Sequence, residues 1–583
     1  MESLADNSFF HNGYHNSSVL IFVPHEDDEI LTAGPLINVL LKLGATINIV
    51  FATNGDFKYP AKTRISEAIK SADILGVSEN QIIFMGYGDS APTYYSKHIF
   101  FHENDKVESL AGYSCTYGAP GHQDYAFCRR NAHNDYTSNN YLGDIIEIIE
   151  VLHPDLIICS DLDEHPDHKM LSVSFDKAIG IIKHKQPEYS PEVLKTFAYS
   201  LYYSAPSDFS SFNNPETQKP VLGITDKYSY DIIDRFNYSW DDRIRFPISI
   251  EQRCGILSKN IISKALKAHS SQGIITRADR VINSDGVFFR RRTDNLAYQA
   301  EISVTSGNAD YLVDFMLYNI NSVIPNSLSL SDYYWQPDEN DNKKRILFKW
   351  QDPIVVEEIV LYGTYSEESS IDKLLIKLSD GYTIETTELQ NNGAPLHINV
   401  GHHTSIEWCE ISVISWHGKE YGISECEFFS NSKHESNISP FCKITIDDNF
   451  VYDYVCSENV KTINLGLYYY GCTGKIEKEV IKGKSKIIGD ILYIDNEDKT
   501  IVIRASNHSG DVYDQISVYR CSKAELRSLE RVDKRNNRFI SLEKKRLKVH
   551  NAFFILKNNG IFFVLRRTWD NIIKPRLVRK NDE

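Results

Sequence analysis

Two short apolar runs, each followed at once by histidine and aspartate residues, constrain this chain more than any other feature. Residues 19–23 lead into Pro24-His25-Glu26-Asp27-Asp28-Glu29, and residues 156–159 lead into a stretch ending in His165-Pro166-Asp167-His168. Short unbroken runs rich in β-branched residues are typical of strands buried on both faces. Helix-like periodicity follows each run, so both clusters are expected where a strand passes into a helix.

Strand-like and helix-like segments alternate through residues 1–297, which predicts an α/β Rossmann-like domain with a parallel sheet wrapped by helices. If the two runs are neighbouring strands, their polar clusters converge at the carboxyl edge of the sheet. The interruption between residues 88 and 140 is aromatic and polar, as in a lid or binding loop. The expected strands are 46–53, 81–86 and 156–160, and the expected helices are 63–76, 139–152 and 167–184.

The two clusters together favour a metal site. A catalytic divalent metal takes two or three His, Asp or Glu ligands and keeps a position open. His25 and Asp28 supply two ligands, and a third must come from elsewhere, such as the second cluster. Taken singly, a His-x-x-His pair is ordinarily two surface histidines, and an acidic run after a strand is ordinarily a solvated helix start.

Further motifs connect this half of the chain to a known family. With Arg64, Leu75-Gly76 and Ala268-His269-Ser270-Ser271-Gln272 beside the two clusters, the sequence resembles the N-acetylglucosaminyl-phosphatidylinositol de-N-acetylase family, also called PIG-L or LmbE-like. Its motifs are His-Pro-Asp-Asp-Glu, His-Pro-Asp-His and Ala-His-x-Ser-Gln. The chain departs from the first motif at Glu26, where proline is usual. We expect that change to be tolerated, although it alters the local charge.

The resemblance implies roles for the residues of both clusters. It makes His25, Asp28 and His168 the zinc ligands, and Asp27 the general base that takes a proton from the metal-bound water, whose pKa falls to about 7. His165, oriented by Asp167, would either donate a hydrogen bond to the tetrahedral oxyanion or protonate the leaving amine. Other divalent ions suit the same ligands as zinc does.

Four residues are candidates for substrate binding, each with an ordinary structural alternative. Arg64 either contacts a substrate hydroxyl or phosphate or pairs with Glu67 on a helix surface. Asp56 either holds a sugar hydroxyl or closes a turn. His269 and Gln272 either line the pocket or cap a helix. His122 and His133 are expected to be loop histidines without a role.

The second half of the chain is expected to be all-β. Residues 298–432 resemble discoidin or coagulation-factor type C domains, which are galactose-binding-like sandwiches, in the order of Trp335, Phe348-x-Trp350 and the segment 421–428. Trp335 and Trp350 are expected in the core rather than stacked on sugar. Residues 433–522 suggest an immunoglobulin-like sandwich without a visible site.

Residues 523–583 form a basic tail with interleaved apolar residues. The tail holds 17 Lys and Arg against 7 Asp and Glu, which gives it a net charge of about +10. Because the whole chain has a charge of −16, the residues before the tail carry about −26. Such a segment suits either an anionic membrane surface or a helical hairpin packed on the acidic body. The overall charge argues against a nucleic-acid partner.

Composition and the N-terminal residues suggest the compartment. The first residues lack signal-peptide character, so we expect a cytoplasmic protein, or one peripheral at the inner membrane face. The ten cysteines include no CxxC pair, which argues against a disulfide framework or a thiolate zinc site. Cys128, Cys159 and Cys409 are expected to be buried thiols.

These observations predict an enzyme. We expect a zinc-dependent de-N-acetylase that hydrolyses the N-acetyl amide of a GlcNAc-type sugar on a glycan, nucleotide or lipid carrier. One alternative is a deacetylase of a small thiol-sugar conjugate, which would need no accessory sandwiches. The other is a glycan-binding scaffold with a vestigial hydrolase domain.

Overall fold

The computed structural model describes most of the chain. The described residues are 16–90, 99–162, 165–198, 244–246, 255–277, 279–282, 286–317, 333–364, 368–390, 394–431, 441–447, 449–450, 453–470, 474–508 and 513–568.

A seven-stranded sheet forms the centre of the first domain, in the order β3-β2-β1-β4-β5-β7-β6. Its first five strands are parallel. At one edge β7 runs antiparallel to β5, and β6 antiparallel to β7, so the sheet is mixed rather than wholly parallel. The strands are β1 (Ser18–Val23), β2 (Thr46–Thr53), β3 (Ile82–Tyr87), β4 (Leu156–Ser160), β5 (Glu192–Thr196), β6 (Ile244–Phe246) and β7 (Gly286–Arg291).

The order of the strands fixes where a site is built. From β1 the chain proceeds outward to β2 and β3, and it then returns to add β4 on the other side of β1. This reversal makes a topological switch point between β1 and β4, outside whose carboxyl ends a crevice is expected. Phe22 of β1 pairs with Cys159 of β4, so the two polar clusters leave the sheet side by side.

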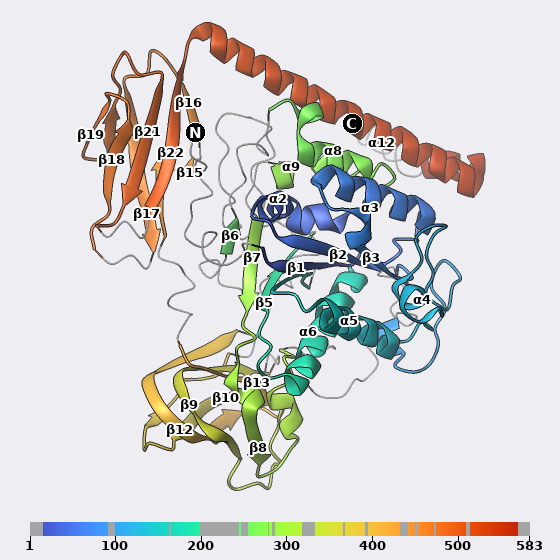
Figure 1. Cartoon of the computed structure of the whole chain (residues 1–583), viewed down its shortest axis with the longest axis vertical. Coiled ribbons are helices and arrows are strands. Elements are labelled where there is room, and N and C mark those ends of the chain that lie inside the picture. Colours follow the sequence, from blue (N-terminus) through green and yellow to red (C-terminus); the bar gives the residue numbers. More distant parts are fainter. Residues whose placement is uncertain are drawn as a thin grey trace, which may run out of the picture.

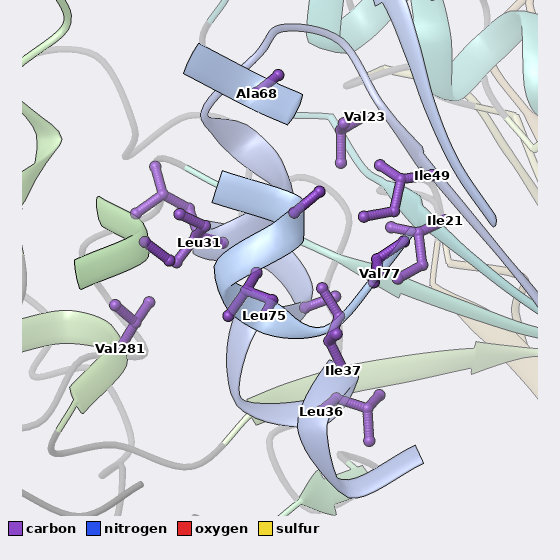
Figure 2. Close-up of a cluster of buried hydrophobic side chains, with 14 of the residues drawn as sticks. Ile21, Val23, Leu31, Leu36, Ile37, Ile49, Ala68, Leu75, Val77 and Val281 are labelled. Carbon is purple, nitrogen blue, oxygen red and sulfur yellow. The ribbon is translucent and has the colours of Figure 1, made fainter. Parts of the chain in front are cut away.

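Helices cover both faces of this sheet (Figure 1). Alternate residues of β1 enter different cores: Val19, Ile21 and Val23 pack with α2, α3 and α8, while Leu20 and Phe22 pack with α5 and α6. Figure 2 shows Ile21, Val23 and Ile49 against side chains of α2 and α3. This double burial explains the unbroken apolar run. The helices are α2 (Asp28–Lys42), α3 (Ala61–Leu75), α5 (Ser138–Leu152), α6 (Pro166–Lys185) and α8 (Ile261–Ala268).

Antiparallel sheets follow, which confirms the predicted fold class. The first has the order β11-β10-β12-β9-β13, with β8 beside β9, and buries both Trp335 and Trp350 as expected. Its strands are β8 (Ala300–Val304), β9 (Arg345–Gly363), β10 (Ser370–Leu378), β11 (Thr383–Glu385), β12 (Pro395–His417) and β13 (Ile423–Phe429).

Two further sheets, β15-β14-β17-β20-β19 and β16-β22-β21-β18, enclose one apolar core. Only β16 departs from the antiparallel pattern, since it runs parallel to β22. The strands are β14 (Phe441–Ile446), β15 (Asn449–Phe450), β16 (Asp453–Ser457), β17 (Thr462–Tyr470), β18 (Glu477–Lys482), β19 (Lys486–Ile488), β20 (Ile491–Tyr493), β21 (Thr500–Ser506) and β22 (Tyr513–Cys521).

The basic tail begins as one long helix, α12 (Lys523–Thr568), which lies beside α8 in Figure 1. The helical hairpin, one of the two alternatives for this tail, is wrong, because residues 523–568 form one helix without a turn. Packing against the body is confirmed, since Ile540 is buried in the core that contains α8. None of the helices in the described part of the chain is long and apolar enough to cross a membrane.

The cysteines of the described residues are free thiols. Cys159 and Cys409 are buried as expected, but the expectation for Cys128 is wrong. Cys128 lies on the short helix α4 (Tyr125–Arg130), whose buried side is formed by Tyr125 and Ala126 instead.

Candidate metal centre

The polar clusters after β1 and β4 meet at the switch point. The Oδ2 atom of Asp28 lies 3.1 Å from His25 Nδ1 and 3.2 Å from His168 Nε2, and all three side chains are buried. His25, His165 and His168 also form a group whose nitrogen atoms lie within 4.8 Å of one another. The tertiary structure thus brings together the three residues that the resemblance assigns to the metal, although His168 lies 140 positions after Asp28.

The His25 ring lies between carboxylates on both edges. Its Nδ1 faces Asp28, while its Nε2 lies 3.1 Å from Asp167 Oδ2 and 3.4 Å from Asp89 Oδ1. Burial opposes the charged ring, but these carboxylates raise the pKa of His25 well above its ordinary value. A neutral imidazole offers one N–H, so one edge would meet a carboxylate with a lone pair. The site therefore requires an added positive charge, which is either a proton or a metal ion.

A divalent cation fits these residues. Asp28 Oδ1 is buried without a hydrogen-bond partner among the described residues. Although burial opposes its charge, His168 and His25 hold the pKa of Asp28 well below its usual range, so the group is a carboxylate at neutral pH. The Nε2–H of His25 can donate to Asp167, which leaves Nδ1 as the lone-pair donor. Carboxylates that orient a metal-binding histidine in this way are common around zinc.

Asp167 and His165 contact each other mainly through the backbone of Asp167. The Asp167 N–H donates to His165 Nδ1 over 3.3 Å, while the Asp167 carboxylate is 3.6 Å from that nitrogen. Ser90 holds the carboxylate through its N–H and Oγ–H, at 2.9 and 2.6 Å. Burial lowers the pKa of His165 to about 3, so the ring is neutral and carries its proton on Nε2. A neutral Nε2–H suits a hydrogen-bond donor to an oxyanion better than a proton-delivering acid.

Asp27 is held in an unusual backbone conformation, with φ at 139°. Its N–H donates to Glu29 Oε2 over 3.0 Å, and its Oδ1 accepts from Arg64 Nη2 over 3.0 Å. Burial raises the pKa of Asp27, which improves it as a proton acceptor. Strained residues of this kind persist only where their surroundings fix them.

Glu29 is the centre of that support. Its Oε1 accepts from Ser71 Oγ and His269 Nε2, each at 2.8 Å, in addition to the bond from Asp27 to Oε2. His269 also follows the last residue of α8. The histidine of the third motif therefore reaches the first motif through one buried carboxylate.

Arg64 is buried and lies between two acids rather than on the helix surface. Its Nε is 3.5 Å from Glu26 Oε2, and burial raises the pKa of Glu26 to about 8. The alternative pair with Glu67 is wrong, because Glu67 accepts hydrogen bonds from Ser270 and Ser271. Gly55, at φ +54°, covers this arrangement, and a Cβ there would lie 2.5 Å from both Arg64 Nε and Glu26 Oε2.

The other candidates lie outside the metal group. Asp56 accepts from the Asp89 N–H at 2.8 Å and from the Tyr117 hydroxyl, so it braces two loops. Gln272 is half-buried and donates to Ser271 Oγ. His133 contacts Asp124 and His122 lies near Glu79, and neither belongs to the metal group.

Sequence reasoning missed Asp89, Ser90, Ser71 and the contact between Glu29 and His269. Asp89 and Ser90 follow the carboxyl end of β3. Polar residues at that end of a parallel strand are candidates for a site, so their position in the sequence could have indicated them. Ser71 is one small polar residue inside a helix and gave no signal.

Two segments match family models. Residues 20–179 match PIG-L, described as GlcNAc-PI de-N-acetylase, and residues 295–429 match a domain of unknown function, DUF7402. The first segment is thus a metal-dependent deacetylase domain, and the expectation of an enzyme is confirmed. No curated protein matches the chain.

Solved structures resemble the same two parts of the chain. The zinc-inhibited form of teicoplanin deacetylase Orf2 is 14% identical, covering 48% of this chain and 99% of its own, with a TM-score of 0.27. The N,N'-diacetylchitobiose deacetylase from Pyrococcus horikoshii is 17% identical, covering 34% and 67%, with a TM-score of 0.21. The family 32 CBM from C. perfringens NanJ in complex with galactose is 14% identical, covering 23% and 94%, with a TM-score of 0.18.

Proposed function

We propose that the protein is a zinc-dependent de-N-acetylase acting on a GlcNAc-type sugar joined to a glycan, nucleotide or lipid carrier. The observation that carries this proposal is the Asp28 carboxylate between His25 and His168, with Asp27 next to it, in a domain of the PIG-L family. We also propose a cytoplasmic location, peripheral at the inner membrane face, for which the basic C-terminal segment is the support.

His25 Nδ1, Asp28 and His168 Nε2 would hold the zinc ion. When bound, the ion would acidify a water molecule and polarise the amide carbonyl. Asp27 takes the proton of the attacking water on Oδ2, since Oδ1 is engaged with Arg64. His165 donates its Nε2–H to the oxyanion, and the proton held by Asp27 passes to the leaving nitrogen. The products are a free amino sugar and acetate.

Roles in substrate binding are proposed for four residues. Arg64 Nη1 is buried and has no hydrogen-bond partner among the described residues, so it can bind a sugar hydroxyl or phosphate oxygen beside Asp27. Asp56, His269 and Gln272 complete the proposed set. Asp56 and His269 act by holding Tyr117 and Glu29 in place.

The test is acetate release from a panel of N-acetylglucosamine conjugates by the purified protein with zinc. Asp27→Asn should lower kcat by about a hundredfold or more while the protein retains its metal. Asp73→Asn, an exposed acid on α3, serves as the control and should leave kcat unchanged. Removal of metal by a chelator should abolish release, and zinc should restore it.

The alternatives make different predictions in the same assay. Release only from a small thiol-sugar conjugate would favour that substrate class. Glycan binding without acetate release from any conjugate would favour the scaffold and would overturn the proposal.

A further inference from the structure

Helix α12 has one face docked on the deacetylase domain. Asn536 is buried and accepts from the Leu257 N–H at 3.1 Å while donating to the Gly255 carbonyl at 2.7 Å. Ile540 is 5% exposed, and Glu543 is buried and bonds to Lys267 Nζ at 3.0 Å. These side chains recur every three or four positions, so they form a single stripe.

The opposite face carries large apolar side chains in a basic surround. Leu542 is 49% exposed, Val549 is 56% exposed and Phe553 is 66% exposed. Their spacings of seven and four residues place them in one line along the helix. Ten Lys and Arg occur in residues 523–553 against four Asp and Glu. The basic residues exposed along this part of α12 are Lys523, Arg527, Arg531, Lys534, Arg535, Arg538, Lys544, Lys545, Arg546 and Lys548.

Helix α12 also contacts the loop that carries Asp56, through His550 and Asn551. Asn551 Oδ1 accepts from Lys58 Nζ at 2.9 Å, and the His550 ring stacks on Tyr59 with centroids 5.9 Å apart. Lys58 and Tyr59 follow Asp56, which bonds to the Asp89 backbone, and Asp89 approaches His25. Phe57, in the same loop, is 57% exposed. Helix α12 thus contacts the two residues that directly follow the exposed Phe57.

We propose that the exposed face of α12, with Leu542, Val549 and Phe553 among its basic residues, binds the surface of an anionic lipid bilayer. Its apolar line would enter the headgroup region while the Lys and Arg side chains contact lipid phosphates and carboxylates. Charge complementarity favours an anionic bilayer as the partner, because the residues before α12 are strongly acidic while basic residues are concentrated in α12. A nucleic acid would use the charge but would leave the apolar line without a partner.

One consequence rests on the proposed function. Because α12 contacts the loop that carries Asp56, binding to a bilayer would bring the metal centre to the headgroups.

The experiment measures sedimentation of the full-length protein with vesicles of phosphatidylcholine alone or mixed with phosphatidylserine. Binding is expected only to the anionic vesicles, and it should weaken at high salt. The triple variant Arg535→Glu, Arg538→Glu, Lys545→Glu should bind about tenfold more weakly or worse. Its matched control is Lys475→Glu, Lys484→Glu, Lys486→Glu, which makes the same charge change at exposed sites of the third domain and should bind like the wild type.

A second variant tests the apolar line. Changing Leu542, Val549 and Phe553 together to serine keeps the charge and should weaken anionic vesicle binding about tenfold, because each side chain loses apolar burial in the interface. Equal binding by all variants and the wild type, or no binding to anionic vesicles, would overturn the proposal. Binding to duplex DNA without vesicle binding would also overturn it.

The vesicle assay contains no sugar substrate, so its result is independent of the proposed deacetylation. A protein that binds anionic vesicles yet releases no acetate would refute only the proposed function. A protein that deacetylates soluble conjugates yet ignores vesicles would refute only the membrane surface.

Discussion

The substitution Glu29→Gln tests whether a buried carboxylate positions Asp27, the proposed general base. Glu29 receives three donors, from the Asp27 backbone, Ser71 and His269. The glutamine amide has one oxygen, so its NH₂ must face at least one of these donors. Each hydrogen bond to a charged group that is lost costs about 1.5–3 kcal/mol.

Loss of the hydrogen bond between Glu29 and the Asp27 N–H should lower kcat by changing the backbone conformation of Asp27. Its φ of 139° is a conformation that costs about 1–3 kcal/mol and needs support from its surroundings. Without Glu29 we expect Asp27 to relax and its carboxylate to move from the attacking water. A penalty of about 1.4–2.7 kcal/mol in the transition state lowers kcat about tenfold to a hundredfold. KM should change less than kcat, because Glu29 itself makes no proposed contact with the substrate.

Acetate release at saturating substrate gives kcat, and elemental analysis of the same sample gives the metal content. Ser71→Ala is the matched comparison, because it removes one donor to Oε1 and keeps the bond from Asp27. We expect it to lower kcat by about fivefold or less. Wild-type kcat in Glu29→Gln, or a loss that only parallels lost metal, would refute the positioning role.

Two further predictions concern the contact between the deacetylase domain and the first sandwich. Gly180→Ala should destabilise the protein by about 1–3 kcal/mol, because the added Cβ would clash with the Asp314 carbonyl oxygen. Gly143→Ala is the control, since its Cβ meets open space and the change should be neutral or stabilising. Thermal unfolding compares the two variants, and equal melting temperatures would contradict the clash. Burial raises the pKa of Glu427 from 4.5 to about 7, so the folded protein favours the protonated carboxyl. The stability that this carboxyl contributes is fully present below pH 4.5 and is lost as the pH rises through about 7. Glu427→Gln should therefore gain about 3 kcal/mol relative to the wild type between pH 4.5 and about pH 8; a melting-temperature difference that does not vary with pH would argue against this.

The amino-acid sequence alone determined the local elements and the half-sites. Residues 19–23 are apolar at every position because both faces of β1 are covered, and that pattern is readable without a structure. The motifs that contain His25, Asp28 and His168 are also readable without a structure, because each lies within ten residues of the end of a buried strand.

The tertiary structure decided which distant groups meet. His269 and Glu29 lie 240 positions apart, and only the docking of α8 against α2 and α3 joins them. Asp89 approaches His25 because β3 and β1 are both bonded to β2, and the sequence does not encode that order locally. The sequence left Arg64 either at the substrate or on the helix surface beside Glu67, and the buried acids next to it exclude the surface position. Periodicity reports only whether a residue is buried, whereas pairing depends on sheet order and helix docking, which are set by the whole core.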